Sequence, residues 1–322
     1  MDQEIKSVNN AAKFAFYYVL SLVALIFMSF GVGITLFQII NKFIVDVINE
    51  FSATYDPDSL KFAISALLIS SPIFYVTMRE IHKNLFSGVL AKNSEVRKWL
   101  SYFILLVSSV VMIDWFIYVV NSFLGGELTL KIGLKALVAI AINAGIFSFY
   151  LYDIKRDEVA GAKNKVIRIY LYASLVIVVT VFISALFVVE SPTETRNRKI
   201  DERVLNNINM IENAITMHYD EFEKLPENLE EIKKTEGYMP EENFQNPLSK
   251  KAIEYKVTGE QEYELCTDFL ASNRNPEENG GRYMVGIESL HDAGYQCLKK
   301  RARNMNDAKF LDDKIMEAEI VQ

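Results

Sequence analysis

The sequence predicts a membrane α-helical bundle of five transmembrane helices, followed by a small α+β domain that is exported. Two observations carry this prediction. Five apolar stretches come first, and each is long enough to cross a bilayer core, which takes about 20 apolar residues as a helix. A polar segment over residues 191–322 follows and contains both cysteines. The apolar stretches cover residues 12–41, 60–78, 99–124, 130–152 and 166–190.

These stretches divide the chain into four parts. We expect a four-helix transmembrane domain over residues 1–158, a fifth transmembrane helix over 159–192, an exported α+β domain over 193–303 and a charged tail over 304–322. Gly31 and Gly33 lie in the first stretch, which is longer than a vertical span requires, and they favour close contact between helices. Gly125 and Gly126 predict a tight turn that makes the third and fourth spans neighbours.

The distribution of cations predicts the topology. Lys and Arg near the N-terminus, after the second span and after the fourth span number two, five and five, and only four lie on the opposite side. Positively charged loops stay in the cytoplasm. We therefore expect the N-terminus on the cytoplasmic side of a bacterial plasma membrane and the C-terminal domain on the opposite, extracytoplasmic side. The four cations on the opposite side are Lys42, Lys61, Lys131 and Lys135.

Cys266 and Cys297 are the only cysteines. An oxidising location favours a disulfide between them, and the alternative is two buried thiols. We expect no metal site, because no histidine or second cysteine pair lies at ligand spacing, and no cofactor.

Charged residues inside the spans are the natural candidates for function. Asp114 lies deep in the third span and Lys135 about one turn into the fourth, so the two are predicted to meet, with Asn143 joining them by a hydrogen bond. An ion pair that fixes the helix register is the favoured interpretation of this intramembrane polar cluster. Part of an ion or proton route is the alternative.

The first four spans resemble an uncharacterised family of bacterial four-helix membrane domains, the domain of unknown function 5671. The similarity covers about residues 10–158 and includes the VRKWL segment, the LGGELT turn and GIFSFYLYDIKRDE at the right spacing. This resemblance implies a fold and no activity.

The exported domain begins with helical periodicity. Apolar residues recur at intervals of three and four over residues 195–219, which predicts an amphipathic helix. Leu225-Pro226 opens the next unit, and a short helix that carries Leu229 and Ile232 is expected after it, with Pro226 near its first turn. Residues 246–250 are expected to form a turn, and AIEYKV and EYELCTDF predict a hairpin. RYMVGIES predicts another strand. The stripe of the amphipathic helix consists of Ile200, Val204, Ile208, Ile211, Ile215 and Tyr219.

This order of elements resembles type II secretion pseudopilins and related pilin-like domains over about residues 166–300. The fifth span with residues 195–219 is similar to the long pilin helix, and LPENLEEI and NPLSKKAIEYKV are similar to segments that follow it. The chain lacks the pilin processing site, so we do not expect it to polymerise into a filament.

Known catalytic motifs are missing from the sequence. None of the metalloprotease, serine hydrolase, Walker A or dinucleotide-binding patterns is present, and nothing nominates a nucleophile, so we do not expect an enzyme. Residues 191–322 hold 18 Lys/Arg and 27 Asp/Glu, a net charge of −9 (18 − 27), which argues against a nucleic-acid partner.

Two functions remain. The first is a cell-envelope anchor or interaction protein, in which the membrane bundle, with the lipid bilayer around it, presents the exported domain to an envelope protein. The alternative is a transporter or channel subunit that uses the polar cluster. Oligomeric state is not predicted.

Overall fold

The structure is a computed structural model, and it describes residues 2–44, 55–87, 95–155, 164–235, 239–274 and 287–302. The chain divides into two compact units, Met1–Val189 and Glu190–Gln322. These are the helical unit and the C-terminal unit.

Five long helices build the helical unit: α1 (Asp2–Phe43), α2 (Pro57–Phe86), α3 (Glu95–Leu124), α4 (Leu130–Lys155) and α5 (Lys165–Val188). All five are long and apolar enough to cross a membrane, so the five predicted spans correspond to five helices. Residue Asp56 caps the start of α2 through its side chain, and Asn164 does the same for α5.

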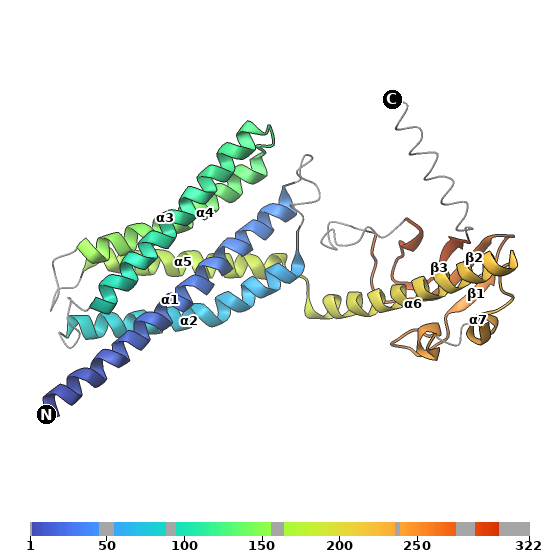
Figure 1. Ribbon diagram of the computed structural model, residues 1–322, viewed down its shortest axis with the longest axis horizontal. Helices are drawn as coiled ribbons and strands as arrows, with labels where there is room; N and C mark the ends of the chain where they lie inside the picture. The colour runs from blue at the N-terminus through green and yellow to red at the C-terminus, as the bar shows by residue number, and fades with distance from the viewer. Residues whose placement is uncertain are drawn as a thin grey trace. The chain divides into compact units, whose positions relative to one another are not determined.

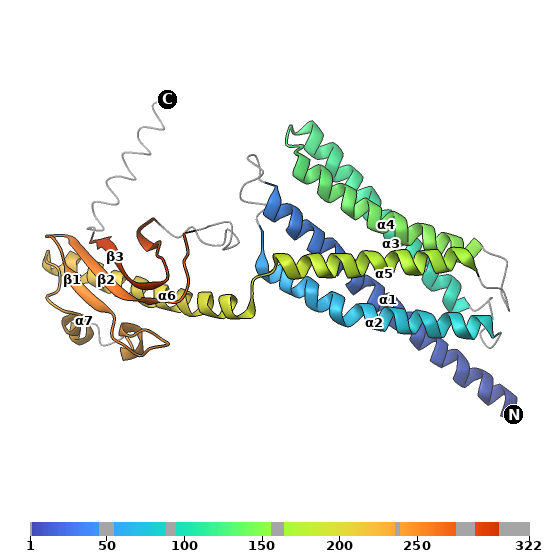
Figure 2. The same ribbon diagram turned by 180° about the vertical axis from the view of Figure 1, so that it is seen from behind.

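Helices α1 and α2 lie side by side, as do α3 and α4 (Figures 1 and 2). The close approach of α1 to α2 depends on Gly31, because a Cβ atom there would lie 2.8 Å from Cγ of Leu67 and 3.2 Å from the carbonyl oxygen of Ala63. The expectation that this glycine permits helix contact is therefore confirmed. Gly33 is less constrained, because a Cβ atom there would lie 3.8 Å from Cδ1 of Ile142, which is an ordinary van der Waals contact.

The connection between α3 and α4 is the predicted tight turn. Gly126 has a φ of +72°, which is the left-handed region that glycine adopts without strain, and the Glu127 N–H donates to the Ser122 carbonyl at 2.8 Å. This geometry reverses the chain and places α4 against α3, as the sequence indicated.

The C-terminal unit starts with α6 (Pro192–Phe222), which is separate from α5. Ser191 and Glu194 form a reciprocal capping box, and Pro192 occupies the first turn. Val189 has extended backbone, so the chain leaves helical geometry between the two helices. The predicted resemblance to one long pilin helix thus differs from the structure, because the Ser-Pro sequence starts a new helix.

Three antiparallel strands follow in the order β1 (Glu254–Val257), β2 (Glu262–Phe269) and β3 (Gly294–Arg301) (Figure 1). The predicted hairpin is β1 and β2, with Val257 opposite Tyr263. The turn at residues 246–250 also forms as expected, because the Lys250 N–H donates to the Asn246 carbonyl.

The predicted RYMVGIES strand is wrong in its described part, where Ile287–Ser289 form a short 3-10 helix, η2. Residues 282–286 and the charged tail over 304–322 lie outside the described residues.

One face of α6 and the sheet enclose the core of the C-terminal unit, together with α7 (Leu229–Thr235) and the 3-10 helix η1 (Glu241–Phe244). Four residues of the predicted α6 stripe are fully buried in this core and Tyr219 packs against it, whereas Ile200 lies outside it. Lys300 of β3 forms a 2.8 Å ion pair with Glu212 of α6 and ties the sheet to the helix. The four buried stripe residues are Val204, Ile208, Ile211 and Ile215.

Candidate functional site

A cavity of about 340 Å³ lies among the helices of the helical unit. Its walls come from α1, α2, α4 and α5, and its volume falls at the lower end of the range of small-molecule pockets. Small side chains at facing positions leave this space, because Ser29, Ala141, Gly145 and Ala173 cannot fill it. Helix α5 closes the cavity on one side.

Polar groups in the cavity wall gather towards the end of the bundle where α2 ends and α5 begins. The Tyr75 hydroxyl donates to the Ser174 hydroxyl at 3.2 Å, which links α2 to α5. The Tyr170 hydroxyl donates to the Ser148 hydroxyl at 3.1 Å, which links α5 to α4. His82 also lines this end. The arrangement suits an apolar chain or ring system whose polar group faces the hydroxyls.

A buried ion pair joins α3 to α4 at the same end. Nη2 of Arg97 donates to Oδ2 of Asp153 at 2.6 Å and to the Asp153 backbone carbonyl at 3.0 Å. The side chains are only 7% and 10% exposed. Sequence reasoning missed this pair, although VRKWL contains Arg97 and YLYDIK contains Asp153.

The predicted intramembrane polar cluster lies on α3 and α4, away from the cavity. Asp114 is exposed on the surface of α3. Lys135 and Asn143 are half-buried on α4, and the Asn143 amide donates to the Ala139 carbonyl at 2.8 Å within its own helix. None of the three lines the cavity. A functional role for them stays a prediction.

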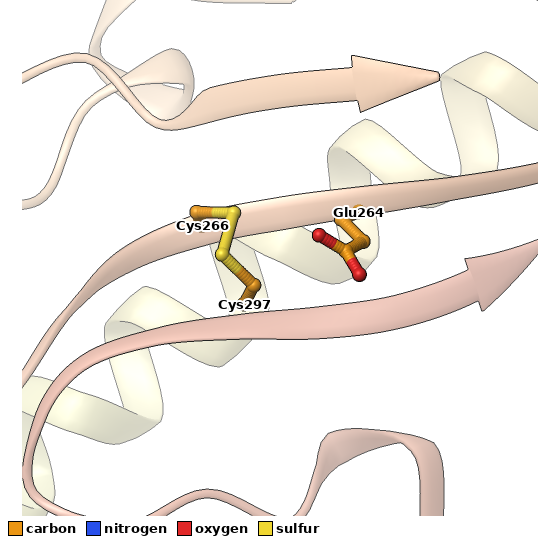
Figure 3. A group of neighbouring side chains, drawn as sticks. All are labelled: Glu264, Cys266 and Cys297. Atoms are coloured by element: carbon orange, nitrogen blue, oxygen red, sulfur yellow. A yellow bond between two sulfur atoms is a disulfide. The ribbon is translucent and has the colours of Figure 1, made fainter. Parts of the chain in front are cut away.

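Cys266 and Cys297 form the predicted disulfide between directly opposed residues of β2 and β3 (Figure 3). Glu264 lies beside the two sulfur atoms and completes the single group of potential metal ligands within the described residues. Because the sulfurs are bonded to each other, they are not thiolates, and one carboxylate remains. This group does not make a metal site in the oxidised protein.

Asp201 connects α6 to the end of β2 in the interior of the C-terminal unit. Its buried carboxylate on α6 accepts hydrogen bonds from the backbone N–H groups of Leu270 and Ala271, at 2.9 and 2.8 Å, just after β2 ends. Burial raises the pKa of this carboxyl, and the two N–H donors act against that rise. No sequence pattern indicates this role, because the backbone N–H donors are the same for every residue type except proline.

The three histidines have different environments and do not form one site. His82 lines the cavity, His218 Nδ1 faces the Lys224 carbonyl at 3.1 Å, and the His291 ring stacks on Phe269 at 3.7 Å between centroids. Burial lowers the pKa of His291, which favours the neutral ring.

One family model matches part of the chain. Residues 15–151 match the family described as Domain of unknown function (DUF5671), which supports the resemblance predicted for the first four spans. Helix α5 and the C-terminal unit lie outside the matched residues. No curated protein and no solved structure matches the chain. The resemblance to pseudopilins stays a prediction.

Proposed function

We propose that this protein is a cell-envelope anchor or interaction protein, in which the helix bundle holds the C-terminal unit outside a bacterial plasma membrane. The observation that carries the proposal is the Cys266–Cys297 disulfide in a unit that directly follows the fifth apolar helix. Disulfides persist in exported, oxidising compartments and are rare in the cytosol. The excess of Lys and Arg at the other ends of the spans agrees with this side.

The role of an interaction protein draws on what the C-terminal unit contains. It has a core of its own, a disulfide and a buried carboxylate that fixes α6 to the sheet. These features stabilise the unit, and a stable unit can present a fixed surface to a partner. An amphipathic helix followed by an antiparallel sheet also agrees with a pseudopilin-like domain. The break before α6 and the missing processing site argue for presentation of single domains instead of a filament.

Affinity capture from solubilised envelopes tests the proposal. The full chain is the bait, and the chain truncated after Val189 is the matched control, because it keeps all five apolar helices. We expect an envelope protein that the full chain recovers and the truncated chain does not. Identical sets of recovered proteins with both baits would contradict an interaction role for the C-terminal unit.

A transporter or channel subunit is the second candidate, and the cavity among α1, α2, α4 and α5 is the observation that favours it. The apolar lining suits an apolar substrate better than an ion. Gly145 lines the cavity, and a Cβ atom there meets nothing within 4 Å. Gly145→Phe should therefore fill part of the cavity and block transport of such a substrate in reconstituted vesicles. If Asp114→Asn with Lys135→Met abolishes an ion flux instead, the route runs through the predicted polar cluster.

A further inference from the structure

A groove of about 550 Å³ runs along the first three turns of α6 in the C-terminal unit. One wall is α6 and the other is the turn after Asn246, which brings Pro247 and Leu248 against the helix. A second hollow of about 370 Å³ shares Arg196, Ile200 and Leu248 with it and extends to Leu270. We call the two together the basic groove.

Three cations line this groove. Arg196, Lys199 and Arg203 follow each other at intervals of three and four, so they share one face of α6. All three side chains are exposed, and within the described part of the chain none of them forms a hydrogen bond or an ion pair. Their charges are therefore available to a ligand.

Within the described residues, none of the four neighbouring carboxylates on or beside this part of α6 forms an ion pair with these cations, and three of the four are engaged elsewhere. Glu190 pairs with Arg198, and Glu194 completes the capping box with Ser191. Asp201 turns inward to the backbone N–H groups after β2. Glu202 is absent from the lining of the groove. The first turns of α6 therefore present a positively charged face, although the C-terminal unit as a whole contains more acidic than basic residues.

The chain connection keeps this face near the end of α5. Four steps of chain lead from Val188 to Pro192 and span at most about 14 Å, whichever way the C-terminal unit is turned. Four further helical residues to Arg196 add about 6 Å. Since α5 is long and apolar enough to span a membrane, the first turns of α6 begin close to the headgroup layer at its end.

Apolar surface lies beside the cations. Leu248 is 52% exposed and Leu270 is 36% exposed, and both line the basic groove. A row of cations with exposed leucines next to it is typical of surfaces that lie at the boundary between lipid headgroups and acyl chains. Phosphate headgroups would meet the cations, and the leucines would face the upper acyl chains.

We propose that the basic groove binds the phosphate headgroups of anionic phospholipids and holds the start of α6 at the membrane surface. Such a contact restricts how the C-terminal unit moves relative to the membrane. The proposal is independent of the side on which the unit lies, because either leaflet can supply the headgroups. It is therefore distinguishable from the proposed anchor function.

The test uses the full chain in nanodiscs of phosphatidylcholine, with or without 30% phosphatidylglycerol, and hydrogen exchange of residues 192–203. We expect slower exchange only with phosphatidylglycerol. Arg196→Gln with Lys199→Gln and Arg203→Gln should abolish that difference. In native mass spectrometry, the same variant should bind phosphatidylglycerol about 100-fold more weakly, from roughly fivefold for each cation near an anionic surface.

A matched triple variant controls for net charge. Lys224→Gln, Lys256→Gln and Lys299→Gln remove three exposed cations from other parts of the unit and should leave the protection unchanged. Thermal unfolding and the mass of the oxidised chain establish that both variants fold with the disulfide.

Two results would overturn the proposal. One is equal exchange of residues 192–203 in both kinds of nanodisc. The other is loss of the protection on adding millimolar inorganic phosphate at constant ionic strength, which would identify a site for small anions instead of a lipid surface. Protection that survives phosphate and disappears only in the groove variant supports the lipid headgroup as the ligand.

Discussion

Replacing Arg97 alone should destabilise the helical unit far more than replacing Arg97 and Asp153 together. The two side chains form a buried ion pair at 2.6 Å, with 7% and 10% of their surfaces exposed. In Arg97→Met the carboxylate stays buried and loses its main cation. Removal of one partner of a buried pair costs about 3–5 kcal/mol in the free energy of unfolding.

The double variant Arg97→Met/Asp153→Leu removes both charges and leaves apolar side chains of similar size. Because the desolvation of both ions is no longer required, its free energy of unfolding should lie within about 1 kcal/mol of the unaltered protein. A double-mutant cycle should therefore give a coupling free energy of at least about 2 kcal/mol.

Unfolding in mixed micelles by titration with sodium dodecyl sulfate measures these free energies, followed by the fluorescence of Trp99 and Trp115 and by circular dichroism. Lys61→Met is the control, because Lys61 and Asp58 form a more exposed pair at 3.6 Å that is worth less than about 1 kcal/mol. If Arg97→Met costs no more than Lys61→Met, or if the double variant is as unstable as the single one, the buried ion pair does not stabilise the helical unit in this way.

Four other predictions concern stability. Cys266→Ala with Cys297→Ala should lower the free energy of unfolding by roughly 3.5 kcal/mol, since the disulfide closes a loop of 31 residues; denaturant titration checks it, and an unchanged midpoint contradicts it. Asp201→Ala should cost about 2 kcal/mol in the same titration, because two backbone donors lose a charged acceptor, whereas a cost near zero would deny the carboxylate its role. Burial depresses the pKa of His291, so its neutral form stabilises the fold above the ordinary value of 6.5, and that stability is lost as the pH falls below 6.5; the thermal midpoint should drop more between pH 7.5 and 5.5 in the unaltered protein than in His291→Phe, and equal drops would refute this. Gly31→Val should destabilise the helical unit by about 1–3 kcal/mol, as measured by unfolding in mixed micelles, whereas Gly145→Ala, which meets open space, should not.

The helices could be predicted from the sequence because each depends on a local property. A single apolar stretch of about 20 residues can pair all its backbone N–H and C=O groups within a membrane by forming a helix. Spacings of three and four residues define the buried face of α6. The turn at Gly125 and Gly126 and the β1–β2 hairpin are also local signals. The start of α6 also has a local signal, Ser191-Pro192-Thr193-Glu194, which is a capping-box sequence that the comparison with one long pilin helix left unused.

The contacts that give the candidate sites their character depend on geometry between distant elements. Arg97 and Asp153 are 56 residues apart and meet only because α3 and α4 pack along each other. The predicted meeting of Asp114 with Lys135 depends on the same packing and also on the rotation of both helices about their axes, which helical spacing within one segment does not determine. In the structure Asp114 is exposed and Lys135 is half-buried. Side-chain volumes on four helices determine the cavity, and no single segment encodes it.

The central claim, that the C-terminal unit lies outside the membrane and is oxidised, is tested most directly by thiol labelling of intact cells. Cys266 and Cys297 are the only cysteines, so a membrane-impermeant maleimide reports on them alone. Our account predicts labelling of intact cells only after treatment with an impermeant reductant, and no labelling of a variant with both cysteines replaced by serine. Labelling only after lysis would place the unit in the cytoplasm and contradict the account.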